Sequence, residues 1–497
     1  MQGVRIPAAV IGLPTSGGEV TRTAVVGEHC RVDFAIHPVD PAAPDILARI
    51  ALPVGWNGKA MMFGGGGYDG TIPDVAGNVP YGPADRPTPL ARGYATFASD
   101  SGHQAALDFQ PTRSLDGAFA VNDEALRNFA GDALKKTRDA AVHLITRHYG
   151  AHPVHSYIAG GSSGGREALA VAQRWPSDFD GVISAYPAWN AASLDLYFGY
   201  QAHVLSRTGA FPGPAKQALL HRSVVDACDG DDGLRDGVIS DEAGCRFDPA
   251  TLRCPDGIDR DDCLTEAQIH AVRALSAPLR WDYPIASGER GYPGFPYLSG
   301  ADMTTPLLGM GTSAPANPMP KTAGYGVQFW DQWVKHFVTR DPARDPLSLD
   351  PRRPGEWRQR ISDLSRVQDV NDADLRPFAD AGGKLLLLHG TADELVSHRS
   401  TVEYFERVRK TTPGTHRFAR FYLVPGANHV NVDAAFAAGW DSVGALEDWV
   451  ERGRPPVRPV VADKTGDRTR PLCQYPTWPR YLGGDPDSAR SFGCGRF

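Results

Sequence analysis

One short segment constrains the fold of this chain more than any other, because it places serines at a glycine-rich turn between an apolar strand and a helix. SYIAG (156–160) is typical of a buried strand, and GGREALAVAQRW (164–175) of a helix. Between them, Gly161-Ser162-Ser163-Gly164-Gly165 fits G-x-S-x-G. Glycines permit the tight turn that exposes a strained serine, and the helix N-terminus behind it favours a developing negative charge. The pattern therefore predicts Ser163 as a nucleophile.

A nucleophilic serine needs a base and an orienting carboxylate, and both residue types follow later strands. Asp393 comes just after KLLLLHG (384–390), and His429 just after RFYLVPG (420–426). Taken singly, each could be a capping or solvated loop residue, and the turn could be a glycine-rich turn without chemistry. Together they occur in the chain order Ser, Asp, His that the α/β-hydrolase fold uses. We therefore predict a triad of Ser163, Asp393 and His429.

A second glycine-rich segment, Gly64–Gly67, follows two predicted strands at 46–54 and 59–63. Missing Cβ atoms let such a backbone approach a substrate closely. A phosphate-binding loop is excluded because neither G-x-x-x-x-G-K-[ST] nor G-x-G-x-x-G with a later ribose-binding acid is present. We expect the amides of Gly67 and Gly164 to form the oxyanion hole.

The arrangement of the whole chain predicts an α/β fold with a large insertion. Strands alternate with helices, including a helix over 119–148 and another over 433–453, which implies parallel βαβ units. From 196 to 375 the texture changes to a cysteine cluster, an acidic loop and many Pro, Gly and aromatic residues. The interpretation is an α/β-hydrolase catalytic domain, 1–195 and 376–497, interrupted by a lid domain, 196–375.

Charge and hydropathy exclude several classes of function. The net charge of −7 and the absence of a basic run argue against nucleic-acid binding, which needs clustered Lys and Arg. No apolar run approaches the roughly 18 residues of a membrane span. The opening MQGVRIPAAVIGLPT has no charged region followed by an apolar one, so no signal peptide is expected within this sequence. Nothing in the sequence indicates an oligomeric state.

Seven cysteines point to an oxidising compartment. Their close spacing in Gly- and Pro-rich segments suits local disulfides better than zinc, because no C-x-x-C pair or neighbouring histidine completes a metal site. The expected pairs are Cys228–Cys245, Cys254–Cys263 and Cys473–Cys494. Cys30 is left over. The protein is therefore expected to be secreted or periplasmic.

An acidic, glycine-rich loop in the insertion, CDGDDGLRDGV (228–238), predicts a calcium site. Calcium takes six to eight oxygen ligands from carboxylates and backbone carbonyls. The side chains of Asp229, Asp232 and Asp236, with the carbonyls of Leu234 and Val238, could supply such a cage. A solvated acidic turn is the alternative. A Ca²⁺ ion here would be structural, since nothing links the loop to the triad.

Long ordered motifs show a resemblance that covers nearly the whole chain. They include LPVGWNGKAMMFGGGGYDG, LARGYATFASDSGH, AGGSSGGREAL, CDGDDGLRDGVIS and PGANHV. With these motifs the chain resembles the tannase and feruloyl esterase family, which includes the mono(2-hydroxyethyl) terephthalate hydrolases. The resemblance implies an α/β-hydrolase domain with a lid, hydrolysis of aromatic carboxylate esters through an acyl-enzyme, the calcium ligands and disulfides given above, and secretion. It also implies that His389 faces the substrate, although a hydrogen-bonded strand-end histidine is an equal alternative.

Two departures from the family pattern stand out. Members of the family carry one cysteine just before the nucleophile and one just after the histidine, joined beneath the triad. With Ser163 as the nucleophile, those positions are Ser162 and Val430 in this chain. Cys30 also lacks the earlier cysteine with which it pairs in the family, so it is either a free thiol or has lost its partner.

The function expected from these features is a serine carboxylesterase acting on small aromatic esters. An esterase for aliphatic or hydroxyalkanoate esters, an amidase or peptidase with the same triad, and an inactive binding protein are the alternatives. The aromatic segments 292–297 and 325–333 of the lid are expected either to hold the aromatic ring of the substrate or to form the lid's own core.

Overall fold

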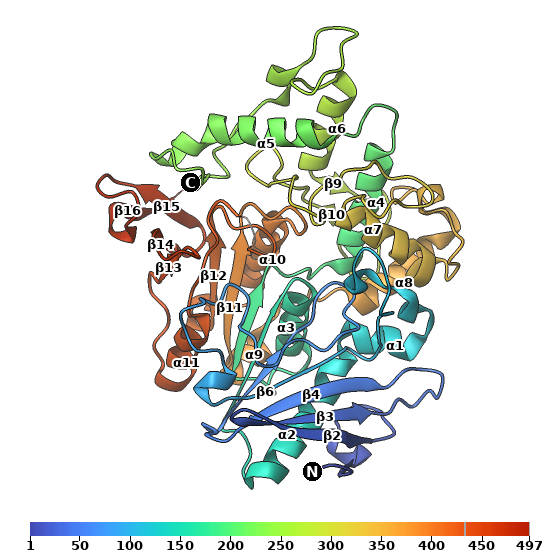
Figure 1. Cartoon of the computed structure of the whole chain (residues 1–497), viewed down its shortest axis with the longest axis vertical. Helices are drawn as coiled ribbons and strands as arrows, with labels where there is room; N and C mark the ends of the chain where they lie inside the picture. The colour runs from blue at the N-terminus through green and yellow to red at the C-terminus, as the bar shows by residue number, and fades with distance from the viewer. Residues whose placement is uncertain (432–433, 497) are drawn as a thin grey trace.

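The computed structural model describes residues 1–431 and 434–496 and is built on one ten-stranded sheet, in the order β1-β2-β3-β4-β6-β5-β7-β8-β11-β12 (Figure 1). The first four strands are antiparallel, and β4 also pairs antiparallel with β6. These strands are β1 (Arg5–Ile6), β2 (Gly18–Val26), β3 (His29–Ile36) and β4 (Ile46–Pro53). The strand predicted at 46–54 is confirmed as β4, whereas β2 and β3 were not predicted.

The other six strands form a parallel half of the sheet, as the alternation of strands and helices predicts. They are β5 (Lys59–Phe63), β6 (Ala95–Ser99), β7 (His155–Gly161), β8 (Gly181–Ala185), β11 (Lys384–Gly390) and β12 (Ala419–Val424). Their residues are almost all buried because helices cover both faces of the sheet. This order of strands, together with the crossing helices, is the α/β-hydrolase fold.

Alternate residues along the parallel strands pack against different helices. On one face, Leu385 and Leu387 of β11 share a core with four helices, and on the other, Leu386 and Leu388 share one with α11. The helices of the first face are α2 (Ala133–Tyr149), α3 (Ser163–Arg174), α9 (Arg376–Asp380) and α10 (His398–Thr411). α11 covers Ser442–Arg452. The helix predicted over 433–453 is therefore confirmed only in its second part: residues 434–441 are not helical, and Asp433 lies outside the described residues.

The helix predicted over 119–148 is interrupted near its middle. A short helix, α1 (Asp123–Arg127), continues through one wide turn (Asn128–Asp132) into α2, and Gly131 at φ 144° breaks the helical path. The interruption frees backbone carbonyls, and two arginines of α3 bind them: the buried Arg166 donates to the oxygen of Phe129 at 2.9 Å, and Arg174 to that of Ala130 at 2.8 Å. The periodicity therefore indicates the helix correctly but not its break.

Residues 196–375, all of which are described, add no strand to the central sheet. Their apolar residues, among them Trp330 and Trp333, form a core together with Tyr68, Phe129 and Leu395 of the catalytic domain. Figure 1 shows this segment, in green and yellow, at one end of the sheet. Its helices are α4 (Ala191–Leu205), α5 (Pro214–Cys228), α6 (Glu266–Ser276), α7 (Tyr325–Gln332) and α8 (Arg358–Gln368), with a small hairpin of β9 (Leu279–Arg280) and β10 (Gly291–Tyr292). The predicted boundary at 195/196 falls inside α4.

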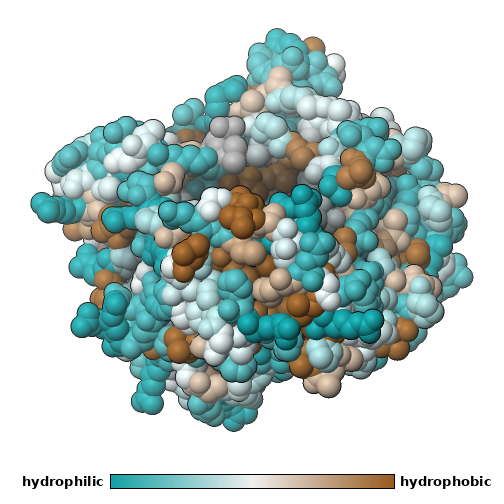
Figure 2. All heavy atoms as spheres, turned by 60° about the horizontal axis from the view of Figure 1, so that its bottom comes forward, coloured by the Kyte–Doolittle hydropathy of each residue, from teal (hydrophilic) through white to brown (hydrophobic). Residues whose placement is uncertain are grey.

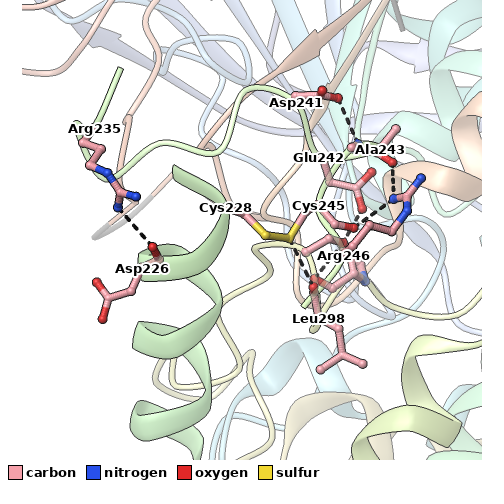
Figure 3. Close-up of a disulfide and its surroundings, with 12 residues drawn as sticks. Asp226, Cys228, Arg235, Asp241, Glu242, Ala243, Cys245, Arg246 and Leu298 are labelled. Atoms are coloured by element: carbon pink, nitrogen blue, oxygen red, sulfur yellow. Dashed lines mark hydrogen bonds between the residues drawn. A yellow bond between two sulfur atoms is a disulfide. The ribbon is translucent and has the colours of Figure 1, made fainter. Parts of the chain in front are cut away.

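The three local disulfides are those predicted: Cys228–Cys245, Cys254–Cys263 and Cys473–Cys494. Figure 3 shows the first of them closing the end of α5 onto the loop that carries Glu242. Cys30 is a free, half-buried thiol. Two hairpins follow α11, formed by β13 (Val460–Ala462) with β14 (Thr469–Pro471) and by β15 (Thr477–Tyr481) with β16 (Phe492–Arg496).

The surface is largely hydrophilic, and one face is hollowed, with hydrophobic residues visible inside the hollow (Figure 2). In the described ranges, 1–431 and 434–496, none of the helices has the length and apolarity that crossing a membrane would require.

Candidate active site

The turn between β7 and α3 places Ser162, not Ser163, in the strained backbone position. Ser162 has φ 61° and ψ −124°, a conformation that costs energy for any residue with a Cβ atom. The glycines around it are required by space: a Cβ atom at Gly160 would lie 2.2 Å from the carbonyl oxygen of Gly164. The sharp strand-to-helix turn is therefore present as predicted, one residue earlier than predicted.

The predicted base and acid meet Ser162. His429 Nε2 lies 3.0 Å from Ser162 Oγ, and His429 Nδ1 lies 2.9 Å from Asp393 Oδ2. Ser163 Oγ instead points to the glycine-rich loop, where it donates to the carbonyl oxygen of Gly67 at 2.7 Å. The assignment of Ser163 as the partner of His429 is thus corrected to Ser162.

The reason for the shift lies in the doubled serine. The sequence contains two overlapping G-x-S-x-G frames, Gly160–Gly164 and Gly161–Gly165, and the spacing alone does not choose between them. The end of the preceding strand distinguishes the two frames. Because β7 runs to Gly161, the turn follows at the next residue, Ser162. With Ser162 at the turn, the residue before it is Gly161 rather than a serine.

Asp393 is fully buried and held by a complete set of donors. Its Oδ1 accepts hydrogen bonds from the amides of Leu395 at 2.9 Å and Val396 at 2.8 Å. Burial alone would raise the pKa of Asp393, but the charge of His429 and the hydrogen bonds from the two neighbouring histidines hold it well below its usual value. The carboxylate is therefore ionised at neutral pH and fixes the ring of His429.

The pKa of His429 is raised. Burial lowers it, but the adjacent carboxylate of Asp393, its hydrogen bond and the charge of Glu394 outweigh that effect. A histidine with a raised pKa has a higher affinity for a proton, which suits a group that accepts a proton from a serine hydroxyl.

His389 does not face a substrate site. It is fully buried, and its Nε2 lies 3.1 Å from Asp393 Oδ2 and 2.9 Å from the carbonyl oxygen of Val396. Two acceptors around one nitrogen identify Nε2 as the protonated atom, with Nδ1 2.9 Å from Thr401 Oγ1. Burial, the largest influence, lowers the pKa of His389, so the ring is neutral. Of the two interpretations given for His389, the structure shows the hydrogen-bonded strand-end histidine, whose ring contacts Asp393.

The glycine-rich loop after β5 packs directly on the start of α3. A Cβ atom at Gly164 would lie 2.5 Å from the carbonyl oxygen of Gly65, and the amide of Gly65 donates to Glu167 Oε2 at 2.8 Å. In the α/β-hydrolase arrangement one oxyanion donor is the amide after the nucleophile. With Ser162 at the turn, that amide belongs to Ser163 rather than to Gly164, and Gly67 stays the predicted second donor.

A carboxyl pair behind this loop was not predicted. Asp69 is buried, and burial first, then the charge of Glu167, raises its pKa well above the usual value. Asp69 lies against the loop, where a Cβ atom at Gly65 would be 2.0 Å from its Oδ1. The motif GGGGYDG contained this residue, but the sequence carried no sign of its burial.

A pocket opens beside Ser162 between α3, α4 and the insertion. Most of the residues that line it are apolar, and a few are polar. They are Gly67, Tyr68, Phe129, Ser162, Ser163, Arg166, Ala188, Ala191, Leu194, Asp195, Phe198, Phe329, Gln368, Leu395 and Val396. Of the two lid segments expected to bind an aromatic ring, only Phe329 lines this pocket. The other aromatic side chains there, such as Tyr297 and Trp330, belong to the buried core of the insertion.

The predicted calcium loop is closed by its own hydrogen bonds. Its three carboxylates each accept hydrogen bonds from backbone amides: Asp229 from Asp236 and Gly237, Asp232 from Leu234, and Asp236 from Val238. Arg470 also pairs with Asp236. Among the residues that the structure describes, no three His, Cys, Asp or Glu side chains form a group that could hold a metal ion.

The donor chemistry of the loop nevertheless suits a hard cation. Asp229 and Asp232 are buried. Burial raises the pKa of Asp232, and the charges of Asp236 and Asp229 raise it further against two opposing hydrogen bonds. The carboxylates thus repel one another, and Arg470 compensates for only one of them.

The fold, together with the contacts among Ser162, His429 and Asp393, defines a hydrolase of the α/β-hydrolase class. Comparison with known proteins identifies the family within this class. The family model described as tannase and feruloyl esterase matches residues 25–495. The chain is 37% identical to an uncharacterized esterase of Agrobacterium fabrum over 98% of this chain and 91% of that protein. It is 30% identical to the mono(2-hydroxyethyl) terephthalate hydrolase of Piscinibacter sakaiensis, over 95% and 85%.

The crystal structure of feruloyl esterase B from Aspergillus oryzae superposes with a TM-score of 0.76 over 99% of this chain and 95% of that one, at 22% identity, which establishes the shared fold. The chain belongs to the tannase and feruloyl esterase family and is a carboxylic ester hydrolase.

Proposed function

We propose that the protein is a serine carboxylesterase in which Ser162 is the nucleophile, His429 the base and Asp393 the acid that orients it. The observation that carries the proposal is the hydrogen-bonded chain from Ser162 Oγ through the His429 ring to Asp393, with Ser162 on the strained turn. A serine whose hydroxyl is 3.0 Å from an oriented imidazole is activated for attack.

In the proposed reaction, His429 Nε2 takes the Ser162 proton while Oγ bonds to the ester carbonyl carbon. Asp393 keeps the proton on Nδ1 and stabilises the imidazolium that forms. The amides of Ser163 and Gly67 donate to the oxyanion. The imidazolium then returns the proton to the leaving alkoxide, which departs as the alcohol. A water molecule, deprotonated by His429, then attacks the acyl carbon. The bond to Ser162 Oγ breaks, the imidazolium returns its proton to Oγ, and the acid is released.

For the substrate we propose an ester of an aromatic acid. The pocket beside Ser162 is walled by the rings of Phe129, Phe198 and Phe329, which suits a planar ring. Polar side chains also line it: Arg166 comes one turn after Ser162 in α3, and Asp195 one turn after Ala191 in α4. A ring bound in this pocket therefore meets polar side chains as well as apolar ones. The names of the relatives, a terephthalate monoester hydrolase and feruloyl esterases, support this class.

The experiment that tests the proposal is hydrolysis of an ester panel by wild type, Ser162→Ala and Ser163→Ala. The panel holds nitrophenyl acetate, an alkyl gallate, an alkyl ferulate, mono(2-hydroxyethyl) terephthalate and a 3-hydroxybutyrate ester. We expect turnover of an aromatic ester, a fall of roughly 10⁴-fold or more for Ser162→Ala, and a fall of less than about tenfold for Ser163→Ala. Turnover of only the hydroxybutyrate ester or the acetate would refute the aromatic acyl group while leaving the nucleophile in place.

The proposal also covers the insertion, the acidic loop and the location of the protein. We propose that residues 196–375 act as a lid, since they supply Phe198, Phe329 and Gln368 to the pocket. We propose Ca²⁺ in the acidic loop, held by the carboxylates of Asp229, Asp232 and Asp236 and the carbonyls of Leu234 and Val238, with a structural role. We propose a secreted or periplasmic location, which the three disulfides support because such bonds persist in oxidising compartments.

A further inference from the structure

A tyrosine lies between the strained turn and the histidine loop. Tyr186 directly follows β8, has φ 34°, and donates its amide hydrogen to the carbonyl oxygen of Leu388 at 2.7 Å. A positive φ is costly for an aromatic residue, so packing around the ring must hold this conformation. The ring is buried, with 9% of the residue exposed.

The phenol ring occupies the space beside Gly161, the residue before Ser162. A Cβ atom at Gly161 would lie 2.4 Å from both Cζ and the hydroxyl oxygen of Tyr186. No real side chain tolerates such a distance, so this turn accepts only glycine at 161 while Tyr186 keeps its place.

The same ring also contacts the base. Its centroid lies 4.8 Å from that of His429 at an interplanar angle of 60°, an edge-to-face arrangement. Its centroid also lies 5.3 Å from that of Tyr81, whose hydroxyl donates to the carbonyl oxygen of Asn428 at 3.1 Å. Tyr186 and Tyr81 thus support the His429 loop at the ring and at the preceding peptide.

We infer that Tyr186 is a positioning residue that sets the His429 ring against Ser162, and that Gly161 provides the space for it; this inference rests on the proposed function. Residues 161 and 430 are glycine and valine, so no disulfide joins the turn to the histidine loop. Packing of Tyr186 against both segments fixes their separation instead.

The role of Tyr186 is one of shape rather than proton transfer. Burial, and next the charge of Asp393, raises the pKa of Tyr186, so its hydroxyl stays protonated. A phenylalanine ring would fill the same space, whereas an alanine would leave a gap beside His429.

The test is a set of five proteins: wild type, Tyr186→Phe, Tyr186→Ala, Gly161→Ala and the double variant Gly161→Ala/Tyr186→Ala. With an ester that wild type hydrolyses, we expect Tyr186→Phe to keep kcat within about threefold and Tyr186→Ala to lower kcat by about 30-fold with KM changed less than threefold. Gly161→Ala should lower kcat strongly in the wild-type background. In the Tyr186→Ala background it should have little further effect, because the clash is gone.

Melting temperatures identify variants that fail to fold, and Tyr186→Leu replaces Tyr186→Ala if the latter does. Full kcat in Tyr186→Ala or Tyr186→Leu, or strictly multiplicative effects of the Gly161 and Tyr186 substitutions, would overturn the inference. Loss of activity in Ser162→Ala, measured beside them, shows whether the proposed function itself holds, so the two failures are distinguishable.

Discussion

The buried carboxylate of Glu242 ties the insertion to the catalytic domain, and its removal has a calculable cost. Glu242 lies in the loop closed by the Cys228–Cys245 disulfide (Figure 3). Its Oε2 lies 3.1 Å from His398 Nε2, and its Oε1 accepts from Arg399 Nη2 at 2.7 Å and from Ser299 Oγ. His398 and Arg399 open α10, five residues after Asp393. The substitution Glu242→Gln removes the charge and keeps the shape.

The magnitude follows from burial. Breaking a buried charge pair costs about 3–5 kcal/mol, but the Arg399 side chain is 32% exposed and is partly solvated, which reduces the loss to about 2–3 kcal/mol. Unfolding entropy is roughly 2.1 cal/mol/K per residue. For 497 residues that unfold together, the loss corresponds to a fall in Tm of about 2–3 °C.

The assay is thermal unfolding of wild type and Glu242→Gln at pH 7 and at pH 4. Burial raises the pKa of Glu242, but the charges of His398 and Arg399 and the hydrogen bonds hold it well below the usual value. A depressed folded-state pKa contributes stability above the unfolded value of about 4.3, and this contribution is lost as the pH falls. Because pH 4 lies close to the unfolded value and well above the folded one, the Tm difference should shrink only slightly at pH 4.

A matched control is Glu266→Gln, which removes an exposed partner of Arg253 in the same insertion and should cost less than about 0.5 kcal/mol. Equal melting temperatures of wild type and Glu242→Gln at pH 7, or a difference that grows at pH 4, would refute the reasoning.

Three further predictions concern the site and the ion. Because the pKa of His429 is raised and the neutral ring is the base, kcat/KM should fall on the acid side with a midpoint above 6.5, and Asp393→Asn should move that midpoint down; a pH–rate profile measures both. Removing Ca²⁺ with a chelator should lower Tm by several degrees and excess Ca²⁺ should restore it, whereas no change in a calorimetric scan would count against the ion. Gly164→Ala should abolish activity, because its Cβ would meet the Gly65 carbonyl oxygen at 2.5 Å; an active, folded variant would contradict the packing described.

The sequence predicted five of the six parallel strands and the three disulfides, because apolar strands and closely spaced cysteines are local signals, whereas β6 was not predicted. Asp393 and His429 each follow such a strand directly, and the structure brings their side chains into contact; their catalytic roles stay a prediction. The antiparallel strands β2 and β3 were missed, because β2 is largely exposed and β3 mixes half-buried polar residues with buried apolar ones, so neither has a continuous apolar run.

The features that the sequence did not predict depend on contacts between residues that are far apart in the chain. Both serines fit the motif, and only the end of β7 selects Ser162. His389 follows the strand pattern of a site residue, yet its direction is set by Asp393 and Thr401, which lie in other elements. The break at Gly131 is stabilised by arginines from another helix, which helical periodicity does not encode.

The central claim, that Ser162 is the nucleophile, is tested most directly by labelling with a fluorophosphonate and locating the adduct by tandem mass spectrometry. The account predicts a single adduct on Ser162, undiminished labelling of Ser163→Ala, and none of Ser162→Ala. An adduct on Ser163, or labelling that survives in Ser162→Ala, would contradict it.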